Sequence, residues 1–448
     1  MKERSKFKIF MVIFFSAMGG MLYGYDIGVI NSAFLFIKDD IPMTTFETSL
    51  LGGSVLFGGA FAILVAGVMA DIIGRKKTLI ISGLIFIISV IIIYLAQSYS
   101  VLLLARLIQG ISVGFITITV PLYLTEVVPG GIRGVAVTLF QLFLTAGILI
   151  SNYIGLLFSS THDWRGMFLT ALFPAIIFFT GSFFLTKSPR WLLMMEKEQE
   201  AKDLLTQSIG AEEAAQQIAE IKAVILKSKE EGSIWQKLSH KHYLVPVLLV
   251  FSIAVLQQLT GINSILQFSS TMLKESGLGS DYAAILGGVT ITAINFLATL
   301  IAVFIADKLE RKFMASFGTF MVAASLIVTG LLALFLPIGE LKGVILLIGF
   351  LCFIFFYAIG PGAYIWVIMS ELLPNGIRSK ALGIALFLNS MASAILASVF
   401  LPISNAFGGS SMLFVCGVCS LLYSFIVLKF VPKTTGRSLE DIEKEFMK

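Results

Sequence analysis

One acidic and one basic residue lie deep inside apolar stretches of this chain. Asp26 lies some 18 residues into the stretch 8–33, and Arg106 lies within the stretch 101–123. A charge inside a membrane costs roughly 2.5–3.5 kcal/mol on insertion scales, so such residues are expected to have a function. Burial favours the neutral carboxyl and a nearby guanidinium favours the carboxylate. A carboxyl whose distance from an arginine changes can therefore bind and release a proton. The alternative is a static ion pair that holds two helices together.

A group of amide side chains lies between residues 257 and 267. On a straight helix, Gln257, Gln258, Asn263 and Gln267 would point to about 0°, 100°, 240° and 280°, so no single face could hold them all. A break at Gly261, which lies between the two pairs, would bring them to one site. Amides both donate and accept hydrogen bonds, which suits a ligand rich in hydroxyl groups. The alternative is ordinary hydrogen bonding between helices. The same two interpretations, a ligand site or hydrogen bonding between helices, apply to three isolated amides, Gln141, Asn295 and Asn389.

The composition indicates that membrane-spanning helices position these residues. The 448 residues are 57% hydrophobic and 13% charged, with a mean hydropathy of +0.94, whereas soluble chains are about a quarter charged. This excludes a soluble enzyme and a disordered protein. Twelve apolar stretches are long enough to cross a hydrocarbon core of about 30 Å: 8–33, 46–70, 78–97, 101–123, 134–158, 165–186, 243–272, 281–306, 313–336, 342–370, 379–402 and 410–431.

Basic residues set the orientation of these spans. Of the 32 Lys and Arg residues, 27 fall on the side of the N-terminus, four fall on the other side and Arg106 lies within a span. By the positive-inside rule, both termini and the polar segment 187–242 are cytoplasmic in a multi-pass protein of the plasma or inner membrane. Topology thus accounts for the basic residues, and no nucleic-acid partner is expected. The basic N-terminus resembles a signal peptide, but the apolar stretch behind it is too long and is expected to remain as a helix.

The chain contains an internal repeat. An Asp-x-x-x-Arg motif at 71–75 follows the second span and recurs at 307–311, which is 236 residues later. A Glu-x-x-Pro-x-x-x-Arg motif at 126–133 follows the fourth span and recurs at 371–378, which is 245 residues later. Two homologous halves of six spans are typical of transporters in which two bundles rock about a central site. The predicted segments are an N-terminal six-helix bundle, a cytoplasmic helical linker, a C-terminal six-helix bundle and a cytoplasmic tail, at 1–186, 187–242, 243–431 and 432–448.

Seven motifs follow one another along the chain. They are Gly24-Tyr25-Asp26-Ile27-Gly28-Val29, Gly67-x-x-x-Asp71-x-x-Gly74-Arg75-Lys76, Arg106-x-x-x-Gly110-x-x-x-Gly114, Pro121-x-Tyr123-x-x-Glu126-x-x-Pro129-x-x-x-Arg133-Gly134, Ser188-Pro189-Arg190-Trp191-Leu192, Gln257-Gln258-Leu259-Thr260-Gly261-Ile262-Asn263 and Gly360-Pro361-x-x-x-x-Trp366-x-x-x-x-Glu371. In this order they resemble the sugar porters of the major facilitator superfamily, over almost the whole chain. The resemblance implies an all-α membrane protein with twelve transmembrane helices in two pseudo-symmetric six-helix bundles. It also implies a secondary active transporter that imports a monosaccharide, a hexose such as glucose or a pentose, together with a proton by alternating access.

The resemblance implies roles for single residues. Proton-coupled sugar porters have an Asp at the position of Asp26 and an Arg in helix 4, where Arg106 lies, which favours symport. Trp366 would offer a flat face to the sugar ring. The alternative interpretation is that Trp366 lies at the membrane interface. The triplet Gly360-Pro361-Gly362 just before it predicts a hinge. The implied sugar-binding residues are Gln141, Gln257, Gln258, Asn263, Asn295, Trp366 and Asn389.

Charged residues recur at the cytoplasmic ends of the spans in both halves. Alone, each would be interpreted as a solvated flank of its span. Their repetition predicts an ion-pair latch between the bundles that is closed when the protein faces outward. The predicted latch residues are Asp71, Arg75, Glu126, Arg133, Arg190, Arg311, Glu371 and Arg378.

The chain departs from the family pattern at six positions. Gln267 and Phe268 stand where two tyrosines usually follow the helix 7 asparagine, and Ser390 stands where a tryptophan is frequent. The binding site is therefore expected to be less aromatic and more polar. Near the latch, two acids and a glycine are replaced, which predicts rewired ion pairs. The replacing residues are Lys187, Lys433 and Glu310.

Other functions fit the sequence less well. A uniporter for a sugar or a polyol such as inositol is the nearest alternative, and counterflow without proton flux would identify it. A sugar receptor would need an output element, whereas only a short tail follows Pro432. An enzyme is not expected, because the three His residues lie in loops without metal-ligand spacing or a nucleophile motif. We expect no cofactor and no metal. The expected partners are a monosaccharide, a proton and the lipid bilayer, and the chain is expected to function as a monomer.

Overall fold

The structure is a computed structural model that describes residues 3–230, 241–305, 309–374, 377–435, 437, 442 and 445–446. Every secondary-structure element in these residues is a helix. The N-terminal half, residues 3–186, contains α1 (Glu3–Ala33), α2 (Ile37–Asp40), α3 (Thr45–Ile73), α4 (Arg75–Leu95), α5 (Tyr99–Val127), α6 (Gly130–Leu157), α7 (Trp164–Leu169) and α8 (Leu172–Phe184). The linker contains α9 (Pro189–Met194), α10 (Glu198–Ile209) and α11 (Ala211–Glu230).

The C-terminal half, residues 241–431, has a matching set of helices. They are α13 (Lys241–Leu259), α14 (Ile262–Glu275), α15 (Asp281–Ile305), α16 (Arg311–Phe335), α17 (Glu340–Ile359), α18 (Pro361–Leu372), α19 (Arg378–Phe407) and α20 (Ser411–Phe430). The described helices provide 12 stretches that are long and apolar enough to cross a membrane, which confirms the predicted number. Asp307 of the repeated motif and parts of the predicted linker and tail lie outside the described residues.

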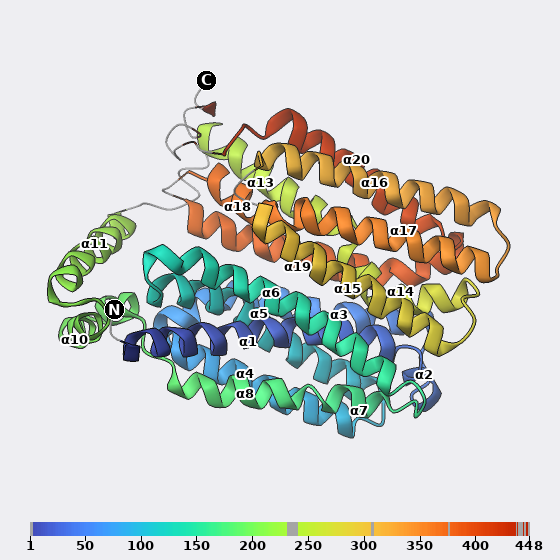
Figure 1. Ribbon diagram of the computed structural model, residues 1–448, viewed down its shortest axis with the longest axis horizontal. Coiled ribbons are helices and arrows are strands. Elements are labelled where there is room, and N and C mark those ends of the chain that lie inside the picture. The colour runs from blue at the N-terminus through green and yellow to red at the C-terminus, as the bar shows by residue number, and fades with distance from the viewer. Residues whose placement is uncertain are drawn as a thin grey trace.

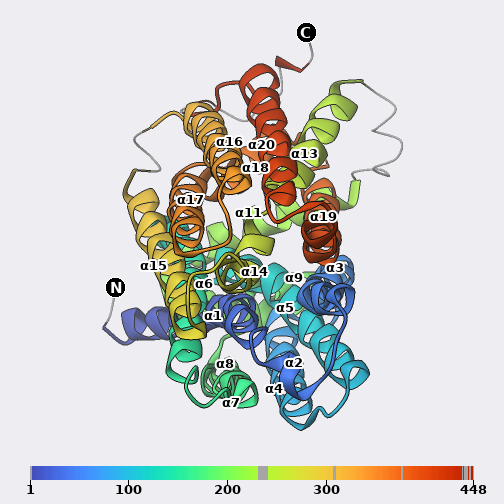
Figure 2. The ribbon, with the colours of Figure 1, turned by 90° about the vertical axis from the view of Figure 1, so that its right-hand side faces the viewer.

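The helices of the two halves lie side by side. In Figure 1, α1 to α8 form the lower part of the molecule and α13 to α20 the upper part. The linker helices α10 and α11 lie beyond one end, next to the start of α1, while α2 and α7 lie at the other end. We call these ends the linker end and the opposite end. Figure 2 views the opposite end, where α14 lies at the boundary between the two sets of helices.

Close contacts between backbones fix the helices that carry the two buried charges. Helix α5 approaches α3 so closely that a Cβ atom at Gly110 would lie 2.2 Å from the carbonyl oxygen of Val55. Helix α1 approaches α6 even more closely, and a Cβ atom at Gly24 would lie 1.8 Å from the carbonyl oxygen of Leu144. Small residues that admit such contacts are typical of packed helices in membranes. The two glycines therefore hold α5 and α1 in fixed positions.

The linker is attached to the N-terminal half through Trp191. Its indole Nε1 donates a hydrogen bond to the carbonyl oxygen of Asp71, at 3.0 Å. Its ring lies against Gly74, where a Cβ atom would come within 3.0 Å of the indole, and the φ angle of 92° at this residue also favours glycine. Around Trp191, apolar side chains of α9, α10 and α11 form a small separate core. The linker helices therefore pack on the N-terminal half.

Candidate functional site

The two membrane-buried charges meet between α1 and α5. Nη1 of Arg106 donates a hydrogen bond to Oδ1 of Asp26, and each side chain is only 1% exposed. The same Nη1 donates to Oε1 of Gln109 at 2.9 Å, and the guanidinium carbon lies 5.5 Å from the centroid of the Phe168 ring. The sequence placed these two residues in different spans, and the structure brings them into direct contact.

The guanidinium of Arg106 is only partly satisfied. Its Nε and Nη2 are buried and have no hydrogen-bond partner among the described residues. A buried ion pair is stable only when its remaining donors are also hydrogen-bonded, because both charges have lost their hydration. The contact with Asp26 is therefore a single-nitrogen contact rather than the two-pronged arrangement that arginine can form with a carboxylate.

The predicted break at Gly261 is present between α13 and α14. Gly261 has φ 84° and ψ 12°, a left-handed conformation that glycine adopts without steric cost. A Cβ atom at this position would lie 2.8 Å from Sγ of Cys416. The break brings the two sides of the helix together, because Nδ2 of Asn263 donates to Oε1 of Gln258 at 3.0 Å.

The amides of α13 and α14 belong to one hydrogen-bonded network with α19. Nδ2 of Asn389 donates to Oε1 of Gln257 at 2.7 Å, and Nε2 of Gln258 donates to Oδ1 of Asn389 at 3.1 Å. Asn263 extends the network by donating to Oγ of Ser393 at 2.9 Å. The network therefore joins four of the seven predicted sugar-binding residues: Gln257, Gln258, Asn263 and Asn389.

Two members of the network were not predicted from the sequence. Nε2 of Gln257 donates to the phenol oxygen of Tyr357 on α17, and Ser393 lies one turn after Asn389 on α19. Tyr357 lies three residues before Gly360, where the predicted hinge appears as a break between α17 and α18. Proximity to that break was the available signal for Tyr357. A serine in an apolar helix carries no comparable signal.

The other predicted sugar-binding residues lie outside the network that the described residues form. Gln141 is exposed on α6, Asn295 is buried on α15, and Trp366 on α18 is 37% exposed. Gln267, a departure from the family pattern, is buried on α14 with its Oε1 lacking a hydrogen-bond partner.

Contacts between the two halves gather at the opposite end. Oδ1 of Asn31 on α1 accepts hydrogen bonds from the backbone N–H of Ser270 at 3.0 Å and from Oγ of Ser269 at 3.3 Å, both on α14. Nδ2 of Asn31 donates to Asn152 on α6. The backbone N–H of Leu401 on α19 donates to Ser49 on α3. Helices of both halves are thus hydrogen-bonded to each other at this end.

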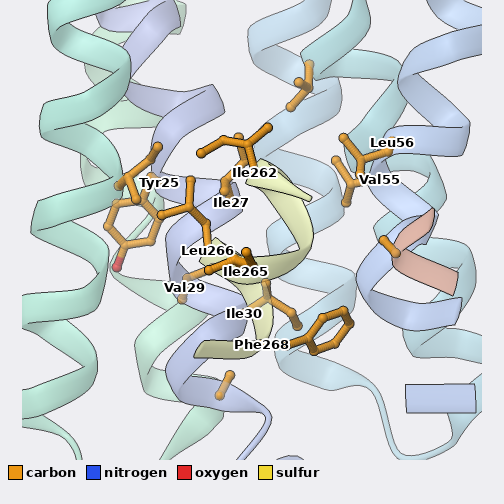
Figure 3. Packing of buried hydrophobic residues seen from close by; sticks show 14 of the residues in the cluster. Tyr25, Ile27, Val29, Ile30, Val55, Leu56, Ile262, Ile265, Leu266 and Phe268 are labelled. Carbon is orange, nitrogen blue, oxygen red and sulfur yellow. The ribbon is translucent and has the colours of Figure 1, made fainter. Parts of the chain in front are cut away.

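Apolar side chains reinforce these contacts. Phe268 stacks between Phe34 and Phe400, with ring centroids 5.3 Å and 5.6 Å apart. Figure 3 shows α14 next to α1, with Ile265 and Ile30 close to Phe268 in the same cluster. Phe268 stands where the family usually has a tyrosine, and here it fills an aromatic stack between the halves.

The charged residues of the linker end pair within each half. Arg75 contacts Asp71 and Glu126, both at 2.8 Å, and its side chain is 2% exposed. In the C-terminal half, Arg311 pairs in the same way with Glu371. Arg378 donates to the carbonyl oxygen of Leu373. Within the described ranges, the Nε atoms of two further predicted latch residues, Arg133 and Arg190, are buried without a hydrogen-bond partner.

The structure gives two departures near these charges a local role. Glu310 is the N-cap of α16 and accepts a hydrogen bond from the backbone N–H of Phe313 at 2.7 Å. Its φ of −69° requires no glycine, unlike Gly74, which precedes α4 in the first half. Lys187, which follows α8, pairs with Glu200, so this ion pair fixes α10 near the end of α8.

Comparisons with known proteins agree with this architecture. A family model described as sugar (and other) transporter matches residues 12–446. The chain is 35% identical to the glucose transporter GlcP of Staphylococcus epidermidis over 97% of both chains. It is 31% identical to the galactose-proton symporter of Escherichia coli over 99% of this chain and 96% of the relative. The inward-open structure of the xylose transporter XylE from Escherichia coli superimposes with a TM-score of 0.82 and 25% identity, over 98% of this chain and 99% of that one.

Proposed function

Since this chain belongs to the sugar porters of the major facilitator superfamily and is a multi-pass transporter rather than an enzyme, we propose that it imports a monosaccharide together with a proton. The substrate is a hexose such as glucose or a pentose, and transport proceeds by alternating access. The observation that carries the proton coupling is the contact between Asp26 and Arg106, which are both buried inside the membrane-spanning helices. The similarity to the galactose-proton symporter of Escherichia coli supports the same conclusion.

The linker end is the cytoplasmic end in this proposal, and the membrane is the plasma or inner membrane. The excess of Lys and Arg on that side supports the orientation. Because Asn31, Phe34 and Ser49 contact the C-terminal half at the opposite end, the extracellular side is closed. The conformation is then inward-facing, which is consistent with its likeness to an inward-open structure. A single chain contains both halves and is sufficient for transport.

The proton cycle follows from the geometry of the buried pair. In the inward-facing conformation, Arg106 contacts Asp26, so the guanidinium favours the carboxylate and releases the proton to the cytoplasm. In the outward-facing conformation, the two side chains separate, and the isolated carboxyl takes up a proton because burial disfavours its charge. The single-nitrogen contact eases this separation.

The sugar binds at the network of amides. Gln257, Gln258, Asn263 and Asn389 offer both donors and acceptors, and in this structure they are hydrogen-bonded to one another. A sugar would exchange these bonds for bonds to its own hydroxyl groups. Gln141, Asn295 and Trp366 would complete the site from α6, α15 and α18. The latch residues of the linker end would pair across the halves only in the outward-facing conformation.

Uptake into proteoliposomes tests this function. The purified chain would be given a panel of labelled sugars, including D-glucose, D-galactose, D-xylose and myo-inositol, with and without an inward proton gradient. We expect accumulation of at least one monosaccharide only when the gradient is imposed. Counterflow of a sugar without any response to the gradient would identify a uniporter instead, and accumulation of myo-inositol alone would assign a polyol substrate.

A further inference from the structure

Gln109 is bound to the same guanidinium nitrogen as Asp26. Nη1 of Arg106 donates both to Oδ1 of Asp26 and to Oε1 of Gln109, the latter at 2.9 Å. Arginine carries only donors, so the amide must present its oxygen to it rather than its nitrogen. Gln109 is 1% exposed, which excludes bulk water from this bond. It lies between Arg106 and Gly110 of the third motif, at a position where that motif requires no particular residue type.

Gln109 and Arg106 lie on one turn of α5, whereas Asp26 lies on α1. Residues three apart are neighbours on the surface of a helix. This turn is fixed against α3, because a Cβ atom at Gly58 would lie 2.2 Å from the carbonyl oxygen of Leu107. A movement of α1 relative to α5 therefore changes the distance from Arg106 to Asp26 and leaves the contact with Gln109 in place.

Arg106 has few other partners that could stabilise its charge. Among the described residues, its Nε and Nη2 have no acceptor, and the ring of Phe168 on α7 lies 5.5 Å from the guanidinium carbon. A buried charge that loses its counter-ion without another partner is strongly destabilised. Gln109 cannot titrate, so it remains an acceptor for Arg106 whatever the charge of Asp26.

Few other titratable groups face this site from the helices packed against α1 and α5. Within the described residues, these helices carry their charged side chains near their ends, apart from Asp26 and Arg106. The phenol of Tyr25 donates to a backbone carbonyl of α7, and Tyr23 is the other phenol near Asp26 on α1. His162 lies in the turn between α6 and α7, where its ring stacks on a phenylalanine. Tyrosines ordinarily titrate near pH 10, so a physiological change of pH acts on this site through Asp26.

We propose that Gln109 is a positioning residue that holds the guanidinium of Arg106 when Asp26 is protonated, and that it thereby sets the pH at which Asp26 binds its proton. This inference rests on the proposed sugar-proton symport. With Asp26 anionic, Arg106 has both a carboxylate and an amide as acceptors. With Asp26 protonated, the charge of the carboxylate is lost and the amide of Gln109 stays. Gln109 therefore matters more to the protonated form than to the ionised one.

Two changes at this position should act in opposite directions. Removing the amide leaves Arg106 dependent on the carboxylate, so Asp26 should bind its proton only at more acidic pH. Adding a carboxylate supplies Arg106 with a second anion and repels the anionic form of Asp26, so the proton should be held to more alkaline pH. A loss of packing alone would not produce shifts of opposite sign.

The protonation of Asp26 can be measured directly in the purified protein. Infrared difference spectra recorded against pH give the midpoint for the carboxyl band that disappears in D26N, and in D26N/Q109E for the acidic variant. Q109M has a side chain of similar length without an acceptor, and its midpoint should fall by roughly 1–2 pH units, the size expected for one hydrogen bond to a charged group. The midpoint of Q109E should rise.

S112A is the matched control for these variants. Ser112 is also buried on α5, but its Oγ donates to the carbonyl oxygen of Ser82 on α4. Its midpoint should equal that of the wild type. Thermal unfolding of each variant checks the fold. Uptake of tritiated D-glucose into proteoliposomes gives a second readout, in which Q109M should require a more acidic external pH for half-maximal uptake and Q109E a more alkaline internal pH.

The outcomes separate this inference from the function on which it rests. If the wild type accumulates no sugar of the panel in response to a proton gradient, the proposed function fails, and the infrared midpoints still test the role of Gln109. A wild-type midpoint in Q109M would overturn that role while symport stands. Shifts of the same sign in Q109M and Q109E, or an equal shift in S112A, would also overturn it. Opposite shifts in the two variants, with S112A unchanged, support it.

Discussion

Arg106 donates to Asp26 through Nη1, while its buried Nε and Nη2 have no acceptor in the part of the chain that the structure describes. The guanidinium is close enough to stabilise the carboxylate of Asp26, and a contact through one nitrogen is easier to separate than a contact through two. A structural ion pair would be expected to use the planar fork of the guanidinium, with two parallel hydrogen bonds. In the proposed function Asp26 is the proton carrier, and a contact through one nitrogen is compatible with a pair that separates.

Replacing Asp26 with asparagine should uncouple sugar movement from the proton. The amide has a shape similar to that of the carboxyl group and cannot titrate, so D26N should lose accumulation driven by a pH gradient. Counterflow requires no net proton movement and should continue at a rate within a few fold of the wild type. Both are measured with labelled sugar in proteoliposomes. A D26N variant that still concentrates sugar would exclude Asp26 as the proton site.

Changing Arg106 should alter the pH profile of uptake. In R106L the cation that favours the carboxylate is absent, so Asp26 should hold its proton and release it only at more alkaline internal pH. Active uptake near neutral pH should then fail, while raising the internal pH should restore part of it. R106K keeps a charge without the planar group and should retain partial activity. Titration of uptake against internal pH compares the variants, and a wild-type profile in R106L would show that the two residues are not coupled.

Single substitutions in the amide network should weaken sugar binding. Q258A and N263A each leave a buried partner unsatisfied, which costs about 1–3 kcal/mol and corresponds to roughly 5- to 150-fold in affinity. S269A is the matched control, because Ser269 lies on the same helix and contacts Asn31 outside the network. Equilibrium binding of labelled sugar, with thermal unfolding as a folding check, gives the result. Wild-type affinity in both variants would remove these residues from the sugar site.

Replacing Gly261 with Ala should destabilise the break between α13 and α14. The left-handed backbone costs roughly 1–2 kcal/mol for a residue with a Cβ atom, and that atom would also lie 2.8 Å from Sγ of Cys416. G210A offers a control, because Gly210 has a φ of 99° and no heavy atom of the described residues lies within 4 Å of the added Cβ. We expect a clear fall in the melting temperature for G261A, a smaller one for G210A, and partial rescue of G261A by C416A. Equal melting temperatures for G261A and the wild type would contradict this account.

Closure at the opposite end should depend on Gly53. A Cβ atom at this position of α3 would lie 2.5 Å from Oγ of Ser398 on α19, so G53A should hold the two halves apart there. On the same helix, Gly67 has no heavy atom within 4 Å of such a Cβ, which makes G67A the control. Spin labels at Thr45 and Asn405, whose side chains lie 3.4 Å apart here, should report a longer mean distance in G53A than in G67A. An unchanged distance would show that the contact does not limit closure.

The sequence predicted the features that rest on single unusual residues. Asp26 and Arg106 stood out because a charge in an apolar span is rare, and Gly261 stood out because it divides a run of amides. The number of spans followed from hydropathy alone and is confirmed. Such features depend on the chemistry of single residues or on the length of an apolar stretch, so they can be predicted without knowledge of the packing.

The features that the sequence did not predict depend on which helices face each other. Asn31 contacts Asn152 and Ser270 only because α1, α6 and α14 meet at one point. Tyr357 joins the amides because the break at Gly360 ends α17 near α13. Of the aromatic partners of Phe268, Phe34 follows α1 in the other half and Phe400 lies on α19. No pattern along one helix encodes these neighbours.

Helix α1 is a continuous helix that carries several of the candidate functional residues. Asp26, Asn31 and Phe34 lie on it or directly after it, and Gly24 and Gly28 press it against the backbone of α6. At a rise of 1.5 Å per residue, the eight residues from Asp26 to Phe34 span about 12 Å, so the acid and the aromatic stack are joined by a stiff lever. A tilt that separates Asp26 from Arg106 must also swing Phe34 against Phe268. In the proposed transport cycle, proton uptake by Asp26 and opening of the opposite end would therefore occur together, and a kink inserted in α1 between Asp26 and Phe34 should allow one to occur without the other.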